Sequence, residues 1–317
     1  MNYTNQKLKT LQIASTVLAL SIFTGLSYAQ IEVDPDLPSY NKTGNVSGNL
    51  NSIGSDTLNN LMTFWAEAFR KHHADINIQI EGKGSSTAPP ALIAGTAQLG
   101  PMSRKMKKEE LERFEDKYGF EPTRIGMELD SLAVYVNKDN PIDSLSLQQV
   151  DAVFSKTRKG GHDEDIATWG QLGLAGMLSG KPISLYGRNS ASGTYGYFKK
   201  KALFKGDYKD RVKEQPGSAS VVLGVTEDLA GIGYSGIGYK TLGVKAIGLS
   251  KKTGETTYKP SYENVLKGNY PLGRMLYVYV AKKPGQPFDA MTKEFLKLVL
   301  SKKGQEIVVK DGSQPRL

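Results

Sequence analysis

The residues best suited to chemistry in this sequence are an arginine and a group of hydroxyls in the segment Arg188-Asn-Ser-Ala-Ser-Gly-Thr194. Arginine presents a planar fork of N–H donors that matches the oxygens of phosphate, sulfate or carboxylate. Ser192, Gly193 and Thr194 stand directly before Tyr195–Phe204, which we predict to be a helix. The first amides of a helix lack intrahelical partners and favour negative charge. The segment therefore predicts an oxyanion-binding loop.

Two further loops share this design, with small and hydroxyl residues at the start of a helix. They are Gly54-Ser-Asp-Thr57 and Gly84-Ser-Ser-Thr87. One such loop alone indicates only a helix start, because Ser, Thr and Asp cap helices in all kinds of proteins. Three of them together with Arg188 favour a shared anion site. The stretch Gly82–Thr87 lacks the GxxxxGK[ST] spacing of a nucleotide loop.

The elements that would carry these loops alternate between helix and strand, which favours a layered α/β fold. Apolar residues recur at helical spacing over residues 58–69, and Ile76–Ile80 alternates as a strand. We expect residues 49–57 to be a loop that begins the folded part. The other predicted strands are 124–136, 182–186, 231–239 (a strand and turn) and 276–281. The other predicted helices are 91–95, 107–118, 146–154, 195–204, 217–226, 288–300 and 303–309.

The first 29 residues have the pattern of a cleaved signal peptide. Lys7 and Lys9 precede a mostly apolar run, Leu11–Leu26, and Ser27-Tyr-Ala29 forms a small-x-small site before Gln30. The run is too short for a comfortable membrane span, and no cysteine near the cut could carry a lipid. We therefore expect an exported, soluble mature chain of about 288 residues, located in the periplasm or secreted further.

The composition argues against several other classes of protein. The chain has no cysteine, which rules out disulfides and thiolate metal sites, and only three histidines, of which the adjacent His72 and His73 are interpreted as solvated surface. We expect no metal and no cofactor. The formal net charge is +9, but the lysine blocks are scattered and no nucleic-acid-binding module accompanies them, so we expect no nucleic-acid partner.

The order of the loops resembles that of the periplasmic phosphate-binding proteins, the substrate-capture components of phosphate ABC transporters. Arg188-Asn-Ser-Ala-Ser-Gly-Thr194 is similar to the Arg-x-x-x-Ser-Gly-Thr phosphate loop of that family. The similarity extends over most of the chain from residue 49 to about residue 309. The other segments that carry it are Ile53–Thr57, Gly82–Ser86, Gln98–Ser103 and Tyr270–Arg274.

The resemblance implies an α/β protein with the two-lobed type II periplasmic-binding fold, two interlobe crossovers and a central cleft. Residues 30–48 are polar and without periodicity, so we expect them to form a flexible mature N-terminus. Breaks in the pattern at residues 137–141 and 239–249 place the two crossovers, which gives lobe 1 at residues 49–136 and 246–317 and lobe 2 at residues 137–245. Inorganic phosphate would bind in the cleft, and the lobes would close over it by a hinge motion. We expect a monomeric binding protein, not an enzyme, that delivers phosphate to a membrane ABC permease.

The contacts of the family, carried over residue by residue, imply a dense cage of donors around the phosphate. Hydrogen bonds to a charged group are worth roughly 1.5–3 kcal/mol each, so many of them can replace a hydration shell. The implied phosphate-binding residues are Ser55, Asp56, Thr57, Ser85, Ser103, Arg188, Ser192, Gly193 and Thr194.

Two positions depart from the pattern of the family. A carboxylate that accepts the proton of monobasic phosphate is usual in the fourth segment, where this sequence has Ser103, and an acidic residue often stands two positions after the arginine, where it has Ser190. We hypothesise that Asp56 is the acceptor that distinguishes phosphate from sulfate. The alternative is that Asp56 only caps the helix that follows it.

Three other functions stay open at this point. The same fold could bind another tetrahedral oxyanion, since Ser103 weakens the usual phosphate signature. An exported phosphate-ester hydrolase could use a loop serine as its nucleophile, although the sequence has no histidine near the hydroxyl loops and no metal-ligand cluster. The basic exterior could also serve an additional role in surface attachment.

Overall fold

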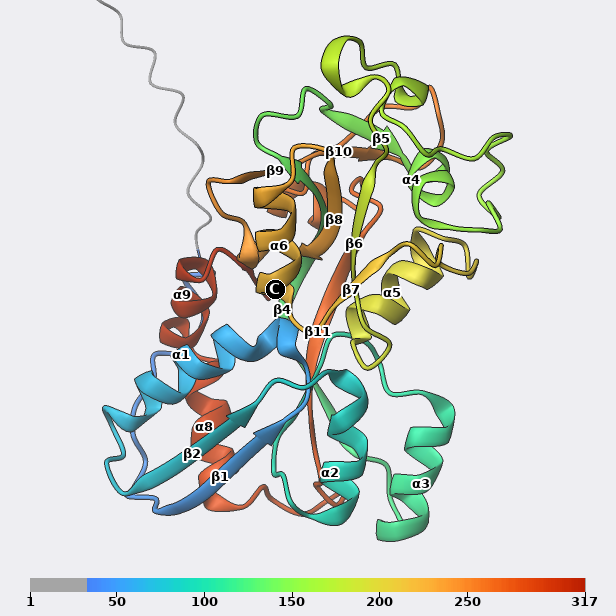
Figure 1. Ribbon diagram of the computed structural model, residues 1–317. Coiled ribbons are helices and arrows are strands. Elements are labelled where there is room, and N and C mark those ends of the chain that lie inside the picture. The colour runs from blue at the N-terminus through green and yellow to red at the C-terminus, as the bar shows by residue number, and fades with distance from the viewer. Residues whose placement is uncertain (1–32, 317) are drawn as a thin grey trace, which may run out of the picture. The chain divides into compact units, whose positions relative to one another are not determined.

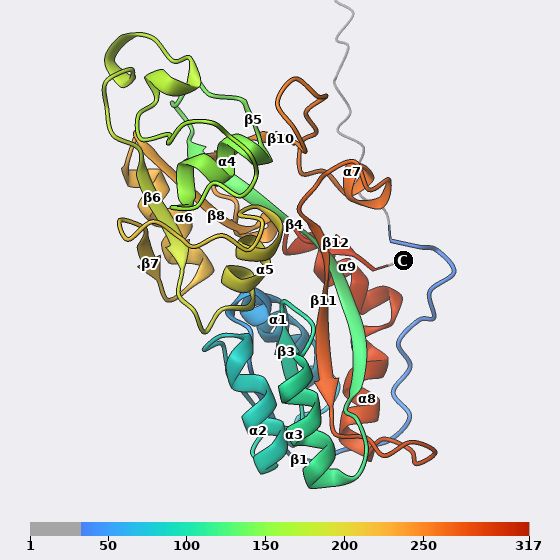
Figure 2. The ribbon, with the colours of Figure 1, turned by 90° about the vertical axis from the view of Figure 1, so that its right-hand side faces the viewer.

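The computed structural model describes residues 33–316 of the chain, and Figures 1 and 2 show it in two views. The predicted signal peptide, residues 1–29, lies outside the described residues. Within residues 33–316, none of the helices combines the length and the apolar character needed to cross a membrane.

The main element is a mixed sheet of eight strands. Its path runs β3–β11–β4–β8–β6–β7, and β9 and β12 also pair with β4. Strand β4 is antiparallel to β11 and β8, whereas β6 is parallel to β8 and β7. The strands are β3 (Gly100–Met102), β4 (Thr123–Asn137), β6 (Ser184–Arg188), β7 (Lys213–Gln215), β8 (Gly231–Gly236), β9 (Val244–Ala246), β11 (Gly273–Val280) and β12 (Gln314–Pro315).

Two short parallel pairs lie outside this sheet. Strand β1 (Gly48–Ile53) pairs with β2 (Ile76–Glu81), and β5 (Ser144–Ser146) pairs with β10 (Gly248–Ser250). The expectation of a loop over residues 49–57 is wrong for its first part, which is strand β1. Only Leu50 and Ile53 are apolar in this strand, so its sequence lacks the alternation that is typical of a strand. Its extended conformation is instead stabilised by pairing with β2.

The predicted helices are present close to their expected positions. In α1, helical spacing buries Leu61, Met62, Trp65 and Phe69 on one face, as the periodicity predicts. The helices are α1 (Asn59–Arg70), α2 (Ala88–Ala94), α3 (Lys108–Tyr118), α4 (Leu147–Phe154), α5 (Gly193–Lys201), α6 (Ser218–Glu227), α7 (Tyr262–Leu266), α8 (Ala290–Val299) and α9 (Lys302–Lys310). Short 3₁₀ turns cover Asp56–Leu58, Ser85–Thr87, Gly170–Leu172, Gly176–Leu178 and Ile237–Tyr239.

The described chain packs around two large apolar cores. The first apolar core contains Trp65 and Phe295, and the second contains Trp169 and Phe198. Strand β4 contributes to both, because Met127 belongs to the first core and Leu132 to the second. Leu276 of β11 belongs to the first core, and Leu272, directly before β11, belongs to the second. Figure 2 shows the two strands running side by side from one group of helices to the other. These strands are the structural link between the two cores.

The segment before β1 has no helix or strand in residues 33–47. Part of it is attached to the first apolar core, because the Tyr40 hydroxyl lies 2.8 Å from Nε2 of His73 and donates to Glu294 Oε1 at 3.0 Å. His73 is therefore buried, at 2 % exposure, rather than solvated as its sequence context suggests. The lobe boundaries and the flexibility of residues 30–48 stay predictions.

Candidate anion-binding site

The structure brings the three hydroxyl loops of the sequence analysis together. Thr57 Oγ1 of the first loop lies 2.9 Å from Thr194 Oγ1 of the third. The amide of Ser86 in the second loop donates to the carbonyl of Ala191 in the third at 3.1 Å. The first two loops follow β1 and β2, and the third follows β6. Strands β1 and β2 pack in the first apolar core and β6 packs in the second. Loops from the two sides of the molecule, one around each core, therefore touch at one point.

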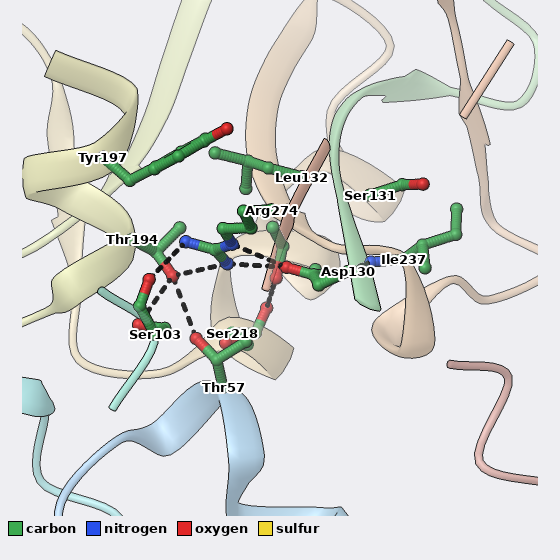
Figure 3. Close-up of polar contacts among 12 residues, drawn as sticks. Thr57, Ser103, Asp130, Ser131, Leu132, Thr194, Tyr197, Ser218, Ile237 and Arg274 are labelled. Carbon is green, nitrogen blue, oxygen red and sulfur yellow. Dashed lines mark hydrogen bonds and ion pairs between the residues drawn. The ribbon is translucent and has the colours of Figure 1, made fainter. Parts of the chain in front are cut away.

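The fourth predicted segment reaches the same point through Ser103, which follows β3. Its hydroxyl lies 3.1 Å from Ser85 Oγ, and Thr194 Oγ1 lies 3.4 Å from Ser103 Oγ. Figure 3 shows Thr57, Ser103 and Thr194 converging from separate segments. The four side chains are all buried. We call Thr57, Ser85, Ser103 and Thr194 the hydroxyl cluster.

Two glycines allow the loops to approach this closely. A Cβ on Gly193 would lie 2.4 Å from Ser85 Oγ and 2.6 Å from Ser103 Oγ, distances that real Cβ atoms do not reach. Gly84 has φ +115°, and a Cβ there would lie 2.6 Å from the Ala191 carbonyl oxygen. Gly193 is thus required at the site itself, and Gly84 is required where the second loop meets the third.

The hydroxyls of the site are oriented by N–H groups behind them. Ser85 Oγ accepts from the Ser103 amide at 3.0 Å, and Ser192 Oγ accepts from the amides of Thr194 and Tyr195 as the N-cap of α5. A hydroxyl has a single proton, so one that accepts from an N–H still has that proton to donate. Ser85 and Ser192 therefore each keep a proton that they can donate, which suits an anion whose oxygens accept hydrogen bonds.

Arg188, at the end of β6, is held rigidly next to Asp56 of the first loop. Its side chain is only 1 % exposed. Nη1 donates to Ser218 Oγ at 2.6 Å, and Nη2 donates to the Pro216 carbonyl at 3.0 Å. Burial lowers the pKa of the Arg188 guanidinium, while the neighbouring Asp56 carboxylate acts in the opposite direction. Arginine stays protonated despite such a shift, so Arg188 is a fixed, buried cation.

Asp56 is the carboxylate that orients Arg188. Its Oδ2 lies 3.1 Å from Arg188 Nη1 and accepts from the Ser218 amide, in the first turn of α6, at 2.7 Å. Asp56 itself begins a 3₁₀ turn whose N-cap residue is Ser55, and the helix that follows, α1, has Leu58 as its N-cap residue; neither receives a side-chain capping bond. Asp56 therefore caps helix α6, on the other side of the site. The alternative that it only caps the helix that follows it is wrong.

The remaining predicted residues have structural roles as well. Ser55 is 2 % exposed, and its amide donates to the Pro101 carbonyl at 2.8 Å, which joins the first loop to β3. The structure thus gathers all nine predicted residues around one point, while their contact with an anion stays a prediction.

Sequence reasoning missed a second buried ion pair at the site, between Asp130 and Arg274. Arg274 Nη2 lies 2.7 Å from Asp130 Oδ2, and both side chains are almost fully buried. A signal was present, because Asp130 interrupts the apolar strand 124–136, and a charge inside a buried strand needs a partner. The partner itself is 144 residues away, so the spacing gave no direct indication of it.

The arrangement is suited to binding an anion by hydrogen bonds rather than by net charge. Each guanidinium has its own carboxylate, since Arg188 pairs with Asp56 and Arg274 pairs with Asp130. The remaining groups are neutral hydroxyls and amides. Within residues 33–316, no group of three or more His, Asp or Glu side chains is arranged to hold a metal ion. Neutral donors beside two charge-balanced ion pairs are suited to an oxyanion.

Comparison with known proteins identifies the family. Residues 41–303 match the model of the PBP superfamily domain. The chain is 57 % identical over 309 residues, 98 % of its length, to the phosphate-binding protein PstS of Pseudomonas aeruginosa, of which it covers 95 %. The chain belongs to this family of binding proteins. A more distant relative is the protein SphX of Synechococcus elongatus, which is 28 % identical over 80 % of this chain and 73 % of that protein.

Solved structures confirm the two-lobed binding-protein fold of the α/β class. A putative phosphate ABC transporter substrate-binding protein from Clostridium perfringens, with bound phosphate, superposes with a TM-score of 0.71 at 24 % identity, covering 85 % of this chain and 100 % of that one. An ABC-type phosphate transport receptor from Vibrio cholerae gives a TM-score of 0.64 at 22 % identity, covering 84 % and 100 %. At these identities the likeness is one of fold.

Proposed function

We propose that this chain is an exported solute-binding protein that captures inorganic phosphate and delivers it to an ABC permease. The Pseudomonas aeruginosa relative is named as a phosphate-binding protein. Its 57 % identity over 98 % of this chain supports the same function here. The site supports it independently. Four buried hydroxyls from separate segments meet at one point, and the buried Arg188 pairs with Asp56, the neighbour of Thr57 in the first loop.

The observation that carries the proposal is the convergence of the hydroxyl cluster with Arg188 and Gly193. Phosphate has oxygens on four sides, so a cage that surrounds it needs donors from several segments. Hydrogen bonds to a charged group are worth about 1.5–3 kcal/mol each, and the donors here are already fixed by their own structural bonds. Donors that are already held by structural bonds lose less freedom when the anion binds, which helps to offset the loss of hydration of the anion.

Asp56 is proposed to select phosphate over sulfate. A carboxylate can only accept hydrogen bonds, and its Oδ2 is occupied by Arg188 and the Ser218 amide. The other oxygen, Oδ1, would accept the proton that phosphate carries and that sulfate lacks at neutral pH. Sulfate would place an oxygen against an unprotonated acceptor, which costs binding energy.

Capture without catalysis is the function that the site favours. The hydroxyls that could act as nucleophiles contact other hydroxyls, amides and Arg274. A phosphate-ester hydrolase would need a group that removes the proton of its nucleophile. The two carboxylates closest to the cluster, Asp56 and Asp130, are instead engaged by arginines.

Export and delivery are the parts of the proposal that concern the whole cell. The signal peptide predicts cleavage after Ala29, and the mature protein isolated from outside the cytoplasm should therefore begin at Gln30. N-terminal sequencing of that protein tests export. Loss of phosphate uptake in a cell that lacks this chain, restored by the chain but not by its Arg188→Ala variant, tests delivery.

A thermal-shift screen with phosphate, arsenate, sulfate and a phosphate monoester tests the binding function. A ligand stabilises by RT ln(1 + [L]/Kd), about 2.7 kcal/mol at a hundred times Kd. Phosphate and arsenate should raise the melting temperature of protein that has been unfolded, dialysed and refolded, while sulfate and the ester should not. No response to phosphate would refute the proposal, and a larger response to sulfate would indicate the alternative oxyanion.

A further inference from the structure

Arg274 and Asp130 lie at the anion site, although neither belongs to a hydroxyl loop. Arg274 is on β11 and Asp130 is opposite it on β4, where the two strands pair antiparallel. Figure 3 shows the guanidinium of Arg274 between Asp130 on one side and Thr194 and Ser103 on the other. The arginine is 6 % exposed and the aspartate 3 %. Burying two charged side chains costs free energy, so a buried ion pair at the site indicates a specific role.

The hydrogen bonds of Arg274 are nearly all used by the protein. Nε donates to Asp130 Oδ2 at 2.8 Å, and Nη2 lies 2.7 Å from the same oxygen. Nη2 also donates to Thr194 Oγ1 at 3.0 Å, and Nη1 donates to the Ser103 carbonyl at 3.2 Å. The ring of Tyr197 packs on the guanidinium, with 5.1 Å between Cζ and the ring centroid. Arg274 is thus fixed by its neighbours on several sides.

The bond from Arg274 decides which way the hydroxyl of Thr194 points. Arginine has no acceptor, so Thr194 Oγ1 must accept in this bond. Its single proton is then left for the opposite side, where Thr57 Oγ1 lies at 2.9 Å and Ser103 Oγ at 3.4 Å. This is the centre of the hydroxyl cluster. A threonine without such a neighbour could turn its lone pairs to that side and repel an anion.

We propose that Arg274 is a positioning residue that makes Thr194 an obligate donor to the bound anion, and that Asp130 holds Arg274 for this task. The inference rests on the proposed phosphate-binding function and adds two residues that the loops do not contain. Asp130 balances the charge of Arg274, so the pair polarises one hydroxyl without adding a second uncompensated cation. The pair therefore strengthens a directed hydrogen bond rather than a general attraction for anions.

The Asp130–Arg274 pair lies where segments from the two apolar cores meet, so its bond to Thr194 depends on how those segments are arranged. Thr194 is at the start of α5, whose Phe198 belongs to the second apolar core, and Ser103 follows β3, which pairs with β11 on the side of the first. Arg274 touches both, at the place where β4 and β11 pass from one core to the other. The three-way contact forms only when the loops of both sides are together, so the donor orientation of Thr194 is complete only in that arrangement.

A double-mutant cycle on phosphate affinity tests the inference. Arg274→Gln and Thr194→Val should each weaken phosphate binding by about tenfold to hundredfold. The double variant should bind no more than about threefold more weakly than the poorer single variant, because both changes remove the same directed bond. Losses that multiply in the double variant would overturn the proposal, since they would mean that Arg274 does not act through Thr194.

Two further variants separate positioning from stability. Arg274→Gln leaves Asp130 buried without its cation, which can unfold the protein, so the paired change Asp130→Asn/Arg274→Gln repeats the cycle with neutral partners. Arg124→Gln, at the far end of the same strand pair, is the matched control and should leave phosphate affinity unchanged. A paired variant with lower melting temperature but unchanged affinity would show a merely structural role and refute the inference.

The titration of the wild-type protein is the reference. Failure of the wild type to bind phosphate contradicts the proposed function, whereas an additive cycle in a binding-competent protein contradicts only this inference.

Discussion

Asp56 Oδ2 lies 3.1 Å from Arg188 Nη1 and 2.7 Å from the amide of Ser218, so one carboxylate oxygen joins the first anion loop to the strand and helix of the other side. In the sequence, Ser190 stands two positions after Arg188, where an acidic residue is often found in the family. Asp56 supplies that carboxylate from a different loop. The same residue is the proposed reader of the phosphate proton, so orientation of the arginine and selection of the anion depend on one side chain.

Asp56→Asn is expected to lower the preference for phosphate over sulfate by at least about a hundredfold. The amide would present an N–H to sulfate in place of an acceptor, and Arg188 would lose its balancing charge. Isothermal titration with each anion measures the ratio. Asp207→Asn removes an exposed carboxylate that pairs with Lys199 and should leave the ratio as it is in the wild type. An unchanged ratio in Asp56→Asn would show that another group selects the anion.

Gly193→Ala is expected to weaken phosphate binding by tenfold or more, on the order of the 1–3 kcal/mol that overpacking costs. The added methyl would lie 2.4 Å from Ser85 Oγ and 2.6 Å from Ser103 Oγ, and these hydroxyls would have to move. Gly196→Ala, one turn further along α5, meets nothing within 4 Å and serves as the control. It should retain affinity and gain up to about 1 kcal/mol of stability. Equal affinity for the two variants would contradict the close approach seen at Gly193.

The free energy of unfolding is expected to depend on pH through Asp311, near the end of α9. Burial raises the pKa of Asp311 to about 6. A carboxyl whose pKa is higher in the folded state binds its proton more tightly there, so its contribution is present at about pH 4 and is lost as the pH rises through about 6. Burial also raises the pKa of the nearby Glu128 well above its ordinary value, which acts in the same direction.

Asp311→Asn should therefore be more stabilising at pH 7 than at pH 4.5, by about 2 kcal/mol. Urea unfolding of the wild type and the variant at both pH values measures this difference. Asp207→Asn provides a control of opposite sign, because the bond from Lys199 lowers the pKa of Asp207 and its loss should destabilise more at pH 7. The same pH dependence in wild type and Asp311→Asn would rule out this carboxyl as the cause.

Most of the fold followed from local patterns. Helix α1 and strand β2 could be predicted because burial on one face imposes periods that the sequence records. Strand β1 could not, since Leu50 and Ile53 are its only apolar residues and its pairing with β2 depends on residues further along the chain. Local periodicity records which face of an element is buried, but it does not record which element covers it.

The site was predictable to the extent that each loop carries its own residues. The hydroxyls at the helix starts and Arg188 can be recognised within their own loops. Their partners cannot be recognised from the sequence in this way, because the Asp56–Ser218 bond spans 162 residues and the Arg274–Asp130 bond spans 144. The residue types of a loop thus predict that an anion binds there, whereas the buried charges that orient the donors become visible only once distant strands are placed side by side.

Isothermal titration of ligand-stripped wild-type protein with phosphate, followed by sulfate in a separate titration, tests the central claim most directly. The claim is that a preformed, charge-balanced cage of hydroxyls, amides and Arg188 captures phosphate. It predicts saturable binding of one phosphate per chain and at least a hundredfold weaker binding of sulfate. The absence of phosphate binding, or sulfate binding of equal strength, would contradict it.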